Sequence, residues 1–497
     1  MFFFLIYLAS NGGIVDHSDG ARSFLFTENF VLNGKLALGL DLPSADELGF
    51  PLENKLRRVA KISYEKNVEM LGNFNQTEYV NEFMEKNKDE FYNQTYLALP
   101  IVAIPFYFMS LYLGFSPINF VPLFLNSSII AVTAVIIFAL GKELFKSERI
   151  GFVLSIIFGL TSFIWPHVSS MFPRPLGILF LMLSIYFILH SRKKSGLVLP
   201  IFAGISFGMS FISMSFFLLF LLGMIIFGIY QFRKNKKQLA AFVIATIIMV
   251  GVQGYANIYR FGAIDDFGFP TLPLESRNPL TSPIKHVEGL YGYLISPSRS
   301  IFISFPIALL HPLGLYYLFK KDPSLALLFI YITLITFLFA ATTPNWDKLD
   351  GRNFGPHRYL IPMIPLIAVS MGALISKFSN SIKAMLTIIG LSIIGFSVNL
   401  IGNLSNVKIG WDYGKVEGIK YWVKHETFAW DPNYSSLSQI YKVITNGYHE
   451  KITGCNYDLY IYCEFGIISL VLLGIIISIV GVMILKILKS KTMAKSL

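Results

Sequence analysis

The sequence predicts an all-α polytopic membrane protein. Of its 497 residues, 54% are hydrophobic and only 14% are charged, and the mean hydropathy is +0.59. Several uninterrupted apolar runs reach the ~20 residues that a helix needs to cross a bilayer. Only helices and closed barrels satisfy their backbone groups in lipid, and these runs are continuous rather than alternating. The spans are therefore expected to be helices.

The positive charges lie mainly in short connectors between the apolar runs. Six connectors hold 18 of the 41 Lys and Arg residues; they cover 142–149, 192–194, 233–237, 320–321, 377–383 and 486–497. They are accompanied by only three acids, Glu143 and Glu148 in the first connector and Asp322 directly after Lys321. The positive-inside rule makes these connectors and the C-terminus cytoplasmic, and it makes the long polar loops external. This distribution accounts for the net charge of +11 without a nucleic-acid partner.

Alternation across the membrane then predicts about 11–13 transmembrane helices. The spans are expected at about 118–141, 150–166, 176–190, 197–212, 214–231, 238–257, 301–319, 323–342, 359–376, 384–401 and 465–485. The stretch 197–231 is expected to be a hairpin rather than one long helix, because Gly208, Ser210, Ser213 and Ser215 and the charge balance favour a turn.

Two apolar segments do not fit this alternation. Residues 97–115 are interrupted or bounded by Pro100, Pro105 and Pro117, so they are expected to form a pair of re-entrant or interfacial helices in the first external loop. Residues 1–15 would cover about 22 Å as a helix, which is short of a ~30 Å hydrocarbon core. They predict a thin or tilted first span or a mis-assigned start, with a signal peptide as the alternative.

The expected organisation has three parts. A membrane module covers 1–401 and includes the first external loop, 16–117. A second external region, either a loop or a small subdomain, covers 402–464. A final span with a basic cytoplasmic tail covers 465–497. Because the cytoplasmic connectors are too short to fold into a site, the functional residues are expected in the external loops.

Two carboxylates, Asp16 and Asp19, mark the point where the N-terminal apolar run meets water. One interpretation is a solvated helix end. The other is an active site at the membrane interface, in which Asp19, with Asp16 beside it, acts as a general base or as a ligand for a divalent cation. A carboxylate suits either role, because it accepts a proton from a hydroxyl group and coordinates hard cations.

Two arginines occur at predicted outer ends of spans. Arg260 closes the span at 238–257, and Arg299 follows a Ser-Pro turn directly before the next span. Either arginine is an interfacial anchor or a ligand for a phosphate group. At Arg299 the nearby hydroxyl groups of Ser296, Ser298 and Ser300 and the amides of a helix N-terminus favour the anion site.

The densest polar cluster lies at 345–360 and contains Arg352, His357 and Arg358. The alternatives are a capped loop with interfacial anchors and an anion site at a helix N-terminus. Arg174, in the short loop 166–175, is a further basic candidate. Several arginines at one interface would suit the monophosphate or diphosphate head group of a lipid.

The chain has two cysteines, Cys455 and Cys463, in one predicted external loop. Their spacing does not match a metal site, and a disulfide between them is expected in an oxidising exterior.

The order of these elements resembles the GT-C fold of membrane glycosyltransferases. More specifically, it is similar to the prokaryotic branch of dolichyl-phosphate-mannose-protein-mannosyltransferase-like proteins. The resemblance covers about 15–376 and rests on four stretches: Ser18-Asp19 leading to Gly34-Lys35-Leu36, then YANIYRFG at 255–262, LISPSRSIF at 294–302 and NFGPHRYLIP at 353–362.

This resemblance implies a GT-C-like catalytic module in 1–401 and a polyprenyl-phosphate sugar donor in the membrane. It also implies a protein, lipid or glycan acceptor on the external side, and a first-loop carboxylate, matched by Asp19, that acts as base or binds Mg²⁺ or Mn²⁺. The expected function is thus sugar transfer from a lipid-linked donor. A transporter or flippase and a non-catalytic assembly subunit are the alternatives, although the sequence lacks the clear internal repeat typical of transporters.

Overall fold

A computed structural model covers residues 1–497. It describes all of them except 14, 16–17, 49–51, 72–74, 93–95, 170, 193, 195, 269–282, 343–357, 405–428, 448–449, 451–454 and 494–497. Within this described part, regular structure is helical, and the β-type pairing is one isolated bridge between Leu38 and Phe91. The predicted fold class, an all-α polytopic membrane protein, is confirmed.

The helices follow one another along the chain in this order: α1 (Phe2–Ala9), α2 (Ser18–Asn33), α3 (Ser44–Glu47), α4 (Leu52–Leu71), α5 (Gln76–Asn87), α6 (Ala98–Leu113), α7 (Pro117–Phe145), α8 (Glu148–Leu160), η1 (Pro166–Ser169), α9 (Arg174–Ser191), α10 (Val198–Ser213), η2 (Ser215–Phe220), α11 (Leu221–Phe232), α12 (Lys236–Phe261), α13 (Pro283–Ile295), α14 (Ile301–Ser304), η4 (Pro306–Leu310), α15 (His311–Lys321), α16 (Pro323–Ala341), η5 (Arg358–Leu360), α17 (Met363–Lys377), α18 (Ile382–Leu404), η6 (Pro432–Tyr434), α21 (Ser436–Thr445) and α23 (Tyr460–Met493).

Seven helices of the described part are long and apolar enough to cross a membrane: Pro117–Phe145, Arg174–Ser191, Ser215–Phe232, Lys236–Phe261, Pro323–Ala341, Ile382–Leu404 and Tyr460–Ile484. Each coincides with a predicted span. The protein is therefore a multi-pass membrane protein.

Two predicted spans differ from the structure, and in one of them the break lies at a proline. The span predicted at 150–166 is shorter, because α8 ends at Leu160 and the chain turns before Pro166. The span predicted at 301–319 is divided into α14, η4 and α15. Phe305 adopts a non-helical conformation there (φ −145°, ψ 70°), and a residue that precedes a proline, here Pro306, disfavours the helical region.

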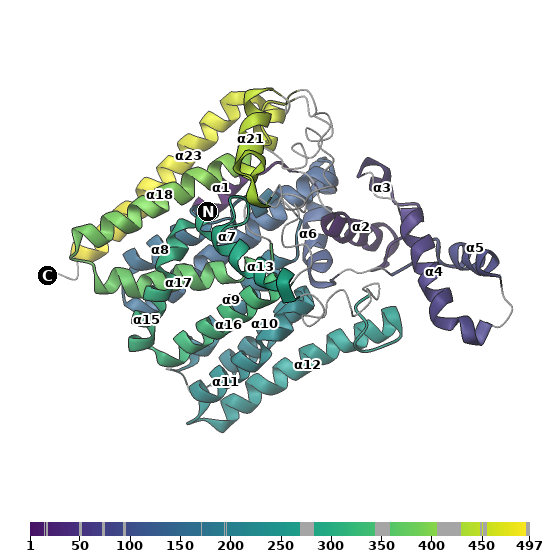
Figure 1. The fold of residues 1–497 in the computed structure, drawn as a ribbon, viewed down its shortest axis with the longest axis horizontal. Helices are drawn as coiled ribbons and strands as arrows, with labels where there is room; N and C mark the ends of the chain where they lie inside the picture. Colours follow the sequence, from purple (N-terminus) through teal and green to yellow (C-terminus); the bar gives the residue numbers. More distant parts are fainter. Residues whose placement is uncertain are drawn as a thin grey trace.

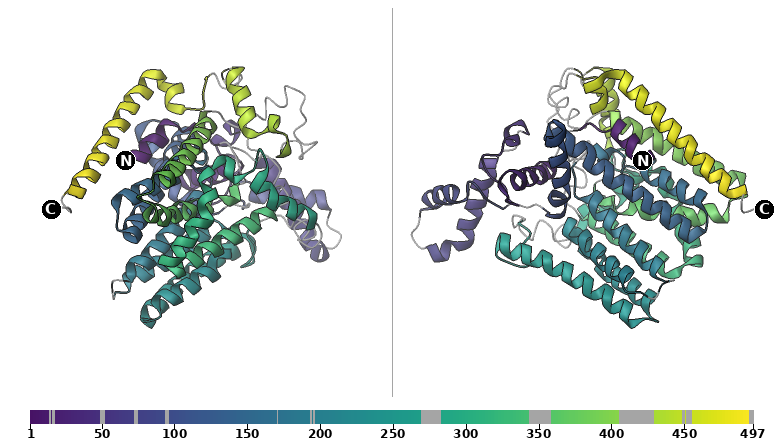
Figure 2. Two further views of the ribbon diagram at one scale, coloured as in Figure 1. Left: turned by 60° about the vertical axis from the view of Figure 1, so that its left-hand side comes forward. Right: turned by 180° about the vertical axis from the view of Figure 1, so that it is seen from behind.

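The bundle is built around α17, in which every residue from Met363 to Ile375 is buried. A helix that is apolar on all sides belongs in the interior of a bundle. By contrast, α12, α18 and α23 lie at its edges in Figures 1 and 2, and their apolar side chains, such as Ile247, Ile393 and Ile476, are exposed. These side chains face lipid.

The predicted hairpin at 197–231 is confirmed. The chain breaks at Met214, which is extended between α10 and η2. The Gln238 side-chain amide at the start of α12 donates to the Lys194 and Gly196 carbonyl oxygens at 2.7 and 3.0 Å, so α10 and α12 begin at the same end of the bundle. Because α10 and α12 both begin at this end, the chain must return to it between them. Helix α11 makes this return.

Four of the basic connectors meet at this same end. Glu143 pairs with His190 at 3.2 Å, Arg192 pairs with Asp322 at 2.7 Å, and the Arg192 Nε–H group donates to Gln231 at 2.6 Å. These contacts join the connectors around 142–149, 192–194, 233–237 and 320–321. The prediction that the connectors share one membrane face agrees with this geometry.

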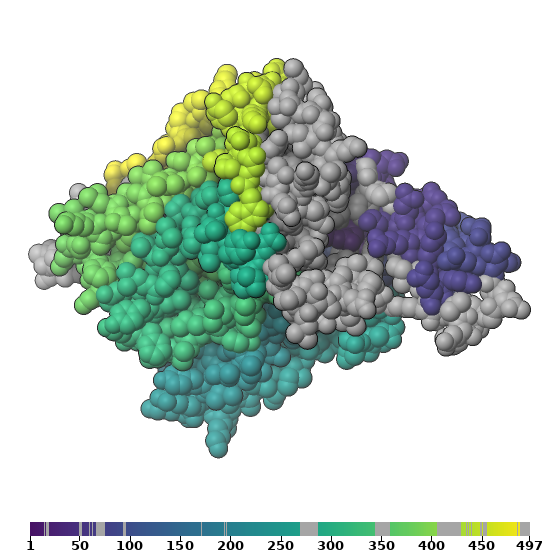
Figure 3. Space-filling model, in the orientation of Figure 1, coloured from purple at the N-terminus to yellow at the C-terminus, as the bar shows by residue number. Residues whose placement is uncertain are grey.

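The first long loop forms helices of two kinds. Residues 97–115 form a single helix, α6, rather than the predicted pair, because Pro105 is accommodated inside it and the turn comes at Gly114 (φ +75°). Figure 1 shows α2 between the bundle and a lobe made by α3, α4 and α5, which protrudes in the space-filling view of Figure 3. We call this part the α3–α5 lobe.

Glu28 of α2 connects the α3–α5 lobe to the bundle by hydrogen bonds. Its carboxylate, in a residue that is 2% exposed, accepts hydrogen bonds from the Ser44 hydroxyl group at 2.7 Å and the Ser44 N–H group at 3.3 Å. It also accepts one from the Tyr107 hydroxyl group of α6 at 3.1 Å. One buried acid thus joins α2, α3 and α6.

Replacing Glu28 by alanine is expected to loosen the lobe. Hydrogen bonds to a charged group contribute ~1.5–3 kcal/mol each, so cleavage of the lobe by added trypsin should accelerate by about tenfold or more. Glu47→Ala, at an exposed acid in α3, is the matched control and should leave the cleavage rate unchanged. Equal cleavage rates in the two variants would show that the Glu28 contacts do not hold the lobe.

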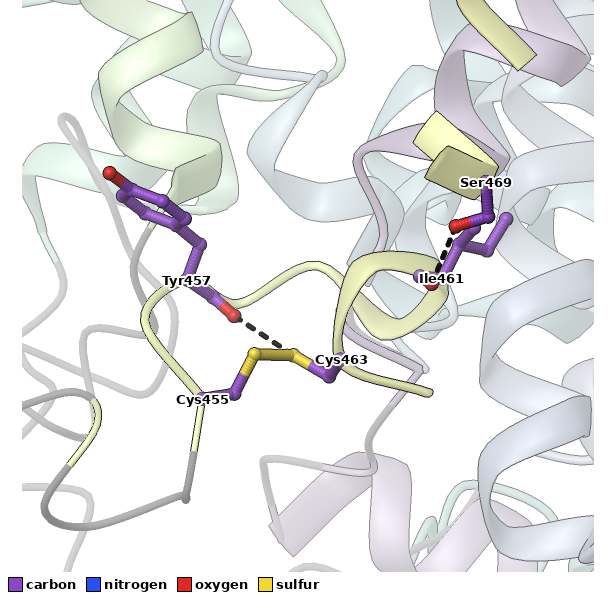
Figure 4. Close-up of a disulfide and its surroundings, with 5 residues drawn as sticks. All are labelled: Cys455, Tyr457, Ile461, Cys463 and Ser469. Carbon is purple, nitrogen blue, oxygen red and sulfur yellow. Dashed lines mark hydrogen bonds between the residues drawn. A yellow bond between two sulfur atoms is a disulfide. The ribbon is translucent and has the colours of Figure 1, made fainter. Parts of the chain in front are cut away.

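The predicted disulfide between Cys455 and Cys463 is formed (Figure 4). It closes the segment that leads into α23, and the Tyr460 N–H group there donates to the Asn11 carbonyl oxygen at 2.9 Å. Gly13, with φ +60°, lies directly under the Tyr460 ring, where a Cβ atom would approach to 2.9 Å. The disulfide segment therefore contacts the chain that connects α1 to α2, and α1, with eight residues, is too short to span alone.

Candidate functional site

The first turn of α2 places Asp19 at a helix N-terminus, where a negative charge is favourable. This turn lies close to the segment that precedes α9: a Cβ atom on Gly20 would be 3.3 Å from the Met171 carbonyl oxygen. The start of α2 therefore lies beside the loop that contains Phe172 and leads to Arg174, the first residue of α9.

Asp19 contacts two guanidinium groups. Its Oδ1 atom pairs with Nη2 of Arg22, one helical turn along α2, and its Oδ2 atom lies 3.3 Å from Nη1 of Arg358. Arg22 and Arg358 are both buried, whereas the Asp19 side chain keeps a quarter of its surface exposed. Asp19 thus contacts Arg358, which is 339 positions away in the sequence.

Arg174 lies near Arg358, because the guanidinium groups of both residues contact the Phe172 ring. The guanidinium carbon atoms of Arg174 and Arg358 lie 5.9 and 5.1 Å from the centre of the Phe172 ring, and that of Arg174 lies 4.6 Å from the centre of the Tyr359 ring. Arg174 is within electrostatic range of both Arg358 and Asp19. We call Asp19, Arg22, Arg174 and Arg358 the Asp19 cluster.

Arg174 has unused hydrogen-bonding capacity. The residue is 3% exposed, and its Nε and Nη1 atoms have no hydrogen-bond partner among the described residues. A buried polar group without a partner costs about 1–3 kcal/mol, and more when it is charged. An anion placed beside these nitrogen atoms would satisfy them.

Two further groups border the cluster. Burial raises the pKa of Tyr96 to about 12, so its hydroxyl group stays protonated at neutral pH and can donate a hydrogen bond; it lies 3.3 Å from Ser215 Oγ. Burial lowers the pKa of Lys55 on α4, nearby Arg22 and Arg58 lower it further, and Asp19 opposes them. Lys55 therefore lies within electrostatic range of Asp19 and Arg22.

Arg260 occupies a separate aromatic environment. Its guanidinium carbon lies 4.7 to 5.7 Å from the ring centres of Phe26, Tyr92 and Phe261. Phe26 is seven positions along α2 from Asp19, which corresponds to ~10 Å along the helix axis. These contacts favour a packing role at the end of α12 over the phosphate contact considered from the sequence.

Arg299 lies in a buried turn of serines. The Ser296 hydroxyl group accepts hydrogen bonds from the Arg299 N–H group at 3.2 Å and the Ser298 N–H group at 3.3 Å, and the Ser300 hydroxyl group accepts one from Phe302 at 3.1 Å. The hydroxyl groups of Ser296 and Ser300, expected to bind an anion, thus accept hydrogen bonds from backbone amides of this segment. The Arg299 side chain is fully buried, and its predicted role in phosphate binding stays a prediction.

Three candidates, Asp16, Arg352 and His357, lie outside the described residues. The sequence interpretation assigned no role to Arg22, Lys55, Phe172 or Tyr359. The spacing of Asp19 and Arg22, three positions apart on a helix, is a signal that predicts their pairing. The other three contacts depend on tertiary packing.

The surroundings of Asp19 fit a divalent cation poorly. Both of its carboxylate oxygen atoms face guanidinium nitrogen atoms, which would repel Mg²⁺ or Mn²⁺. Within the described part of the chain, no group of three His, Cys, Asp or Glu side chains is arranged to hold a metal ion. The cluster suits an anion better than a cation.

Fold and cluster together define a helical multi-pass membrane protein with a buried, arginine-rich polar site. Comparison with protein-family models finds no matching family, and comparison with curated proteins finds no matching sequence.

Proposed function

We propose that the protein is a glycosyltransferase that moves a sugar from a polyprenyl-phosphate donor to an acceptor on the external side of the membrane. The observation that carries this proposal is the Asp19 cluster, in which a carboxylate and three guanidinium groups from distant segments meet. We place the cluster on the external side, with the basic connectors and the C-terminus in the cytoplasm, because the positive-inside rule orients the chain that way.

In the proposed reaction Asp19 takes the proton from an acceptor hydroxyl group. The acceptor oxygen then bonds to the anomeric carbon, the bond from that carbon to the phosphate oxygen breaks, and polyprenyl phosphate leaves with the bonding electrons. Arg22 and Arg358 lie beside the carboxylate that accepts this proton and hold that carboxylate in place. Electrostatic stabilisation of the leaving phosphate should contribute most to the rate.

Arg174 and Arg358 are the proposed ligands of the phosphate group. Arg174 offers buried nitrogen atoms that no described residue satisfies, and Arg358 is close enough to exchange Asp19 for a phosphate oxygen. Aromatic rings on one side of both guanidinium groups exclude water, which strengthens their attraction for an anion.

Replacing Arg174 by alanine is expected to weaken the binding of undecaprenyl phosphate to the full chain in nanodiscs. Losing a charge-assisted hydrogen bond corresponds to a fall in affinity of about tenfold or more. Binding of undecaprenol, which lacks the phosphate, should not change. Arg233→Ala, at an exposed arginine of a basic connector, is the control.

Undecaprenyl phosphate bound equally by wild type and Arg174→Ala would remove the proposed phosphate site. A product assay separates the rival functions. In proteoliposomes a transferase yields a covalently glycosylated acceptor. A flippase moves the lipid without that product, and an assembly subunit does neither.

A further inference from the structure

The α3–α5 lobe contains a polar cleft that none of the residues of the Asp19 cluster lines. This cleft has a volume of about 630 Å³ and lies between the loop that begins α3, the first turn of α4 and the last turns of α5. Its volume falls within the range of ~300–1,000 Å³ that is usual for sites that bind organic ligands.

The walls of the cleft are fixed by contacts within the lobe. The Leu40 N–H group donates to the Lys88 carbonyl oxygen at 2.7 Å, next to the bridge between Leu38 and Phe91. Further along the two helices, the hydroxyl groups of Ser63 on α4 and Tyr79 on α5 lie 2.9 Å apart. The cleft is therefore formed before any ligand arrives, which lowers the entropic cost of binding.

The cleft wall carries three carboxylates, Asp46, Glu53 and Glu85, and one cation, Lys88. Glu53 pairs with Arg57 at 3.0 Å, and Glu85 pairs with Lys88 at 2.7 Å. These two ion pairs leave the Asp46 carboxylate as the remaining charge of the wall. The wall therefore repels an anionic ligand, and a cationic ligand would gain little Coulomb energy in an open, hydrated site.

The remaining lining suits a hydroxyl-rich ligand. The amides of Asn54 and Asn81 each offer donors and an acceptor, and the Asp46 carboxylate accepts further hydrogen bonds. Leu52 and Met84 supply apolar surface between these groups. Sugar rings present alternating hydroxyl groups and C–H faces, and both kinds of surface have a counterpart here.

We propose that this cleft binds a short carbohydrate chain. The proposal does not depend on transferase activity, since it concerns binding at a site that the Asp19 cluster does not form. Helix α4 runs between the two sites. Glu53 and Asn54 line the cleft, and the next residue, Lys55, lies within electrostatic range of Asp19. Leu56 packs in the same apolar core as Phe24 of α2.

Binding of soluble tetrasaccharides to the full chain in nanodiscs tests this proposal. Maltotetraose, chitotetraose and mannotetraose are the probes, and titration calorimetry is the measurement. At least one sugar is expected to bind, and the double variant Asn54→Ala, Asn81→Ala should bind it about tenfold or more weakly, because two hydrogen-bonding amides are lost. Asp46→Ala should weaken binding by a smaller factor.

Glu82→Gln is the matched control, because Glu82 lies on α5 beside Asn81, is exposed and does not line the cleft. It should bind the sugar as wild type does. Three results would overturn the proposal: no binding of any of the three sugars, the same affinity in the double variant as in wild type, or a preference for a lysine tetrapeptide over every sugar.

Discussion

Replacing Asp19 by asparagine is expected to lower sugar transfer by about 10²–10⁴-fold, the usual contribution of a general base. Asparagine keeps the shape of the side chain and an oxygen atom that can face Arg22, but its amide does not accept a proton at neutral pH. The lipid phosphate should still bind, since Arg174 is unchanged. The measurement is transfer of a radiolabelled hexose from its polyprenyl-phosphate donor in membranes that contain the variant.

Asp41→Asn provides the control for this experiment. Asp41 is an exposed acid in the same loop, so its neutralisation changes the net charge of the loop equally without touching the cluster. Transfer by Asp41→Asn should match that of wild type. Unchanged transfer by Asp19→Asn would eliminate the proposed base.

Replacing Arg358 by alanine is expected to reduce transfer by about 10²–10³-fold, the usual cost of removing one group that stabilises developing negative charge. The leaving phosphate loses a buried guanidinium group, the one that lies 3.3 Å from the Asp19 Oδ2 atom in the structure. Steady-state transfer rates in the same membranes measure the loss.

The lysine variant of this position separates charge from geometry. Arg358→Lys keeps the positive charge but presents a point charge instead of a planar group with several donors, so it should recover part of the activity and not all of it. Arg149→Ala, at an exposed arginine in the first turn of α8, is the control and should transfer normally. The proposed role of Arg358 would be wrong if the alanine variant transferred as fast as wild type.

The membrane spans were predictable because a bilayer sets their length. The runs that became α7, α12 and α16 each hold enough consecutive apolar residues to cross, and they match their predicted ranges within a few residues. The breaks were harder to place. Phe305 ends α14 because a proline follows it, whereas Pro105 lies inside α6, so the same residue type has different effects in different packing environments.

The cluster was predictable only in part. Asp19 and Arg358 were candidates because each lies at the predicted outer end of an apolar segment, and in the structure their side chains form an ion pair. Their link to Arg174 depends on the Phe172 ring, which contacts both guanidinium groups, and no periodicity in the sequence predicts such a contact. At Arg299 the sequence suggested a ligand site that these contacts do not favour. The hydroxyl group of Ser296, expected to face a ligand, accepts hydrogen bonds from the backbone N–H groups of its own turn.

A double-mutant cycle on Asp19 and Arg358 tests most directly whether these residues work as one site. Transfer is measured in wild type, Asp19→Asn, Arg358→Ala and the combined variant. Residues that act together give strongly non-additive losses, with coupling energies of about 0.5–3 kcal/mol. The combined variant is therefore expected to transfer sugar far faster than the product of the two single losses implies. Losses that simply multiply would show that the two side chains act independently and that no common site exists.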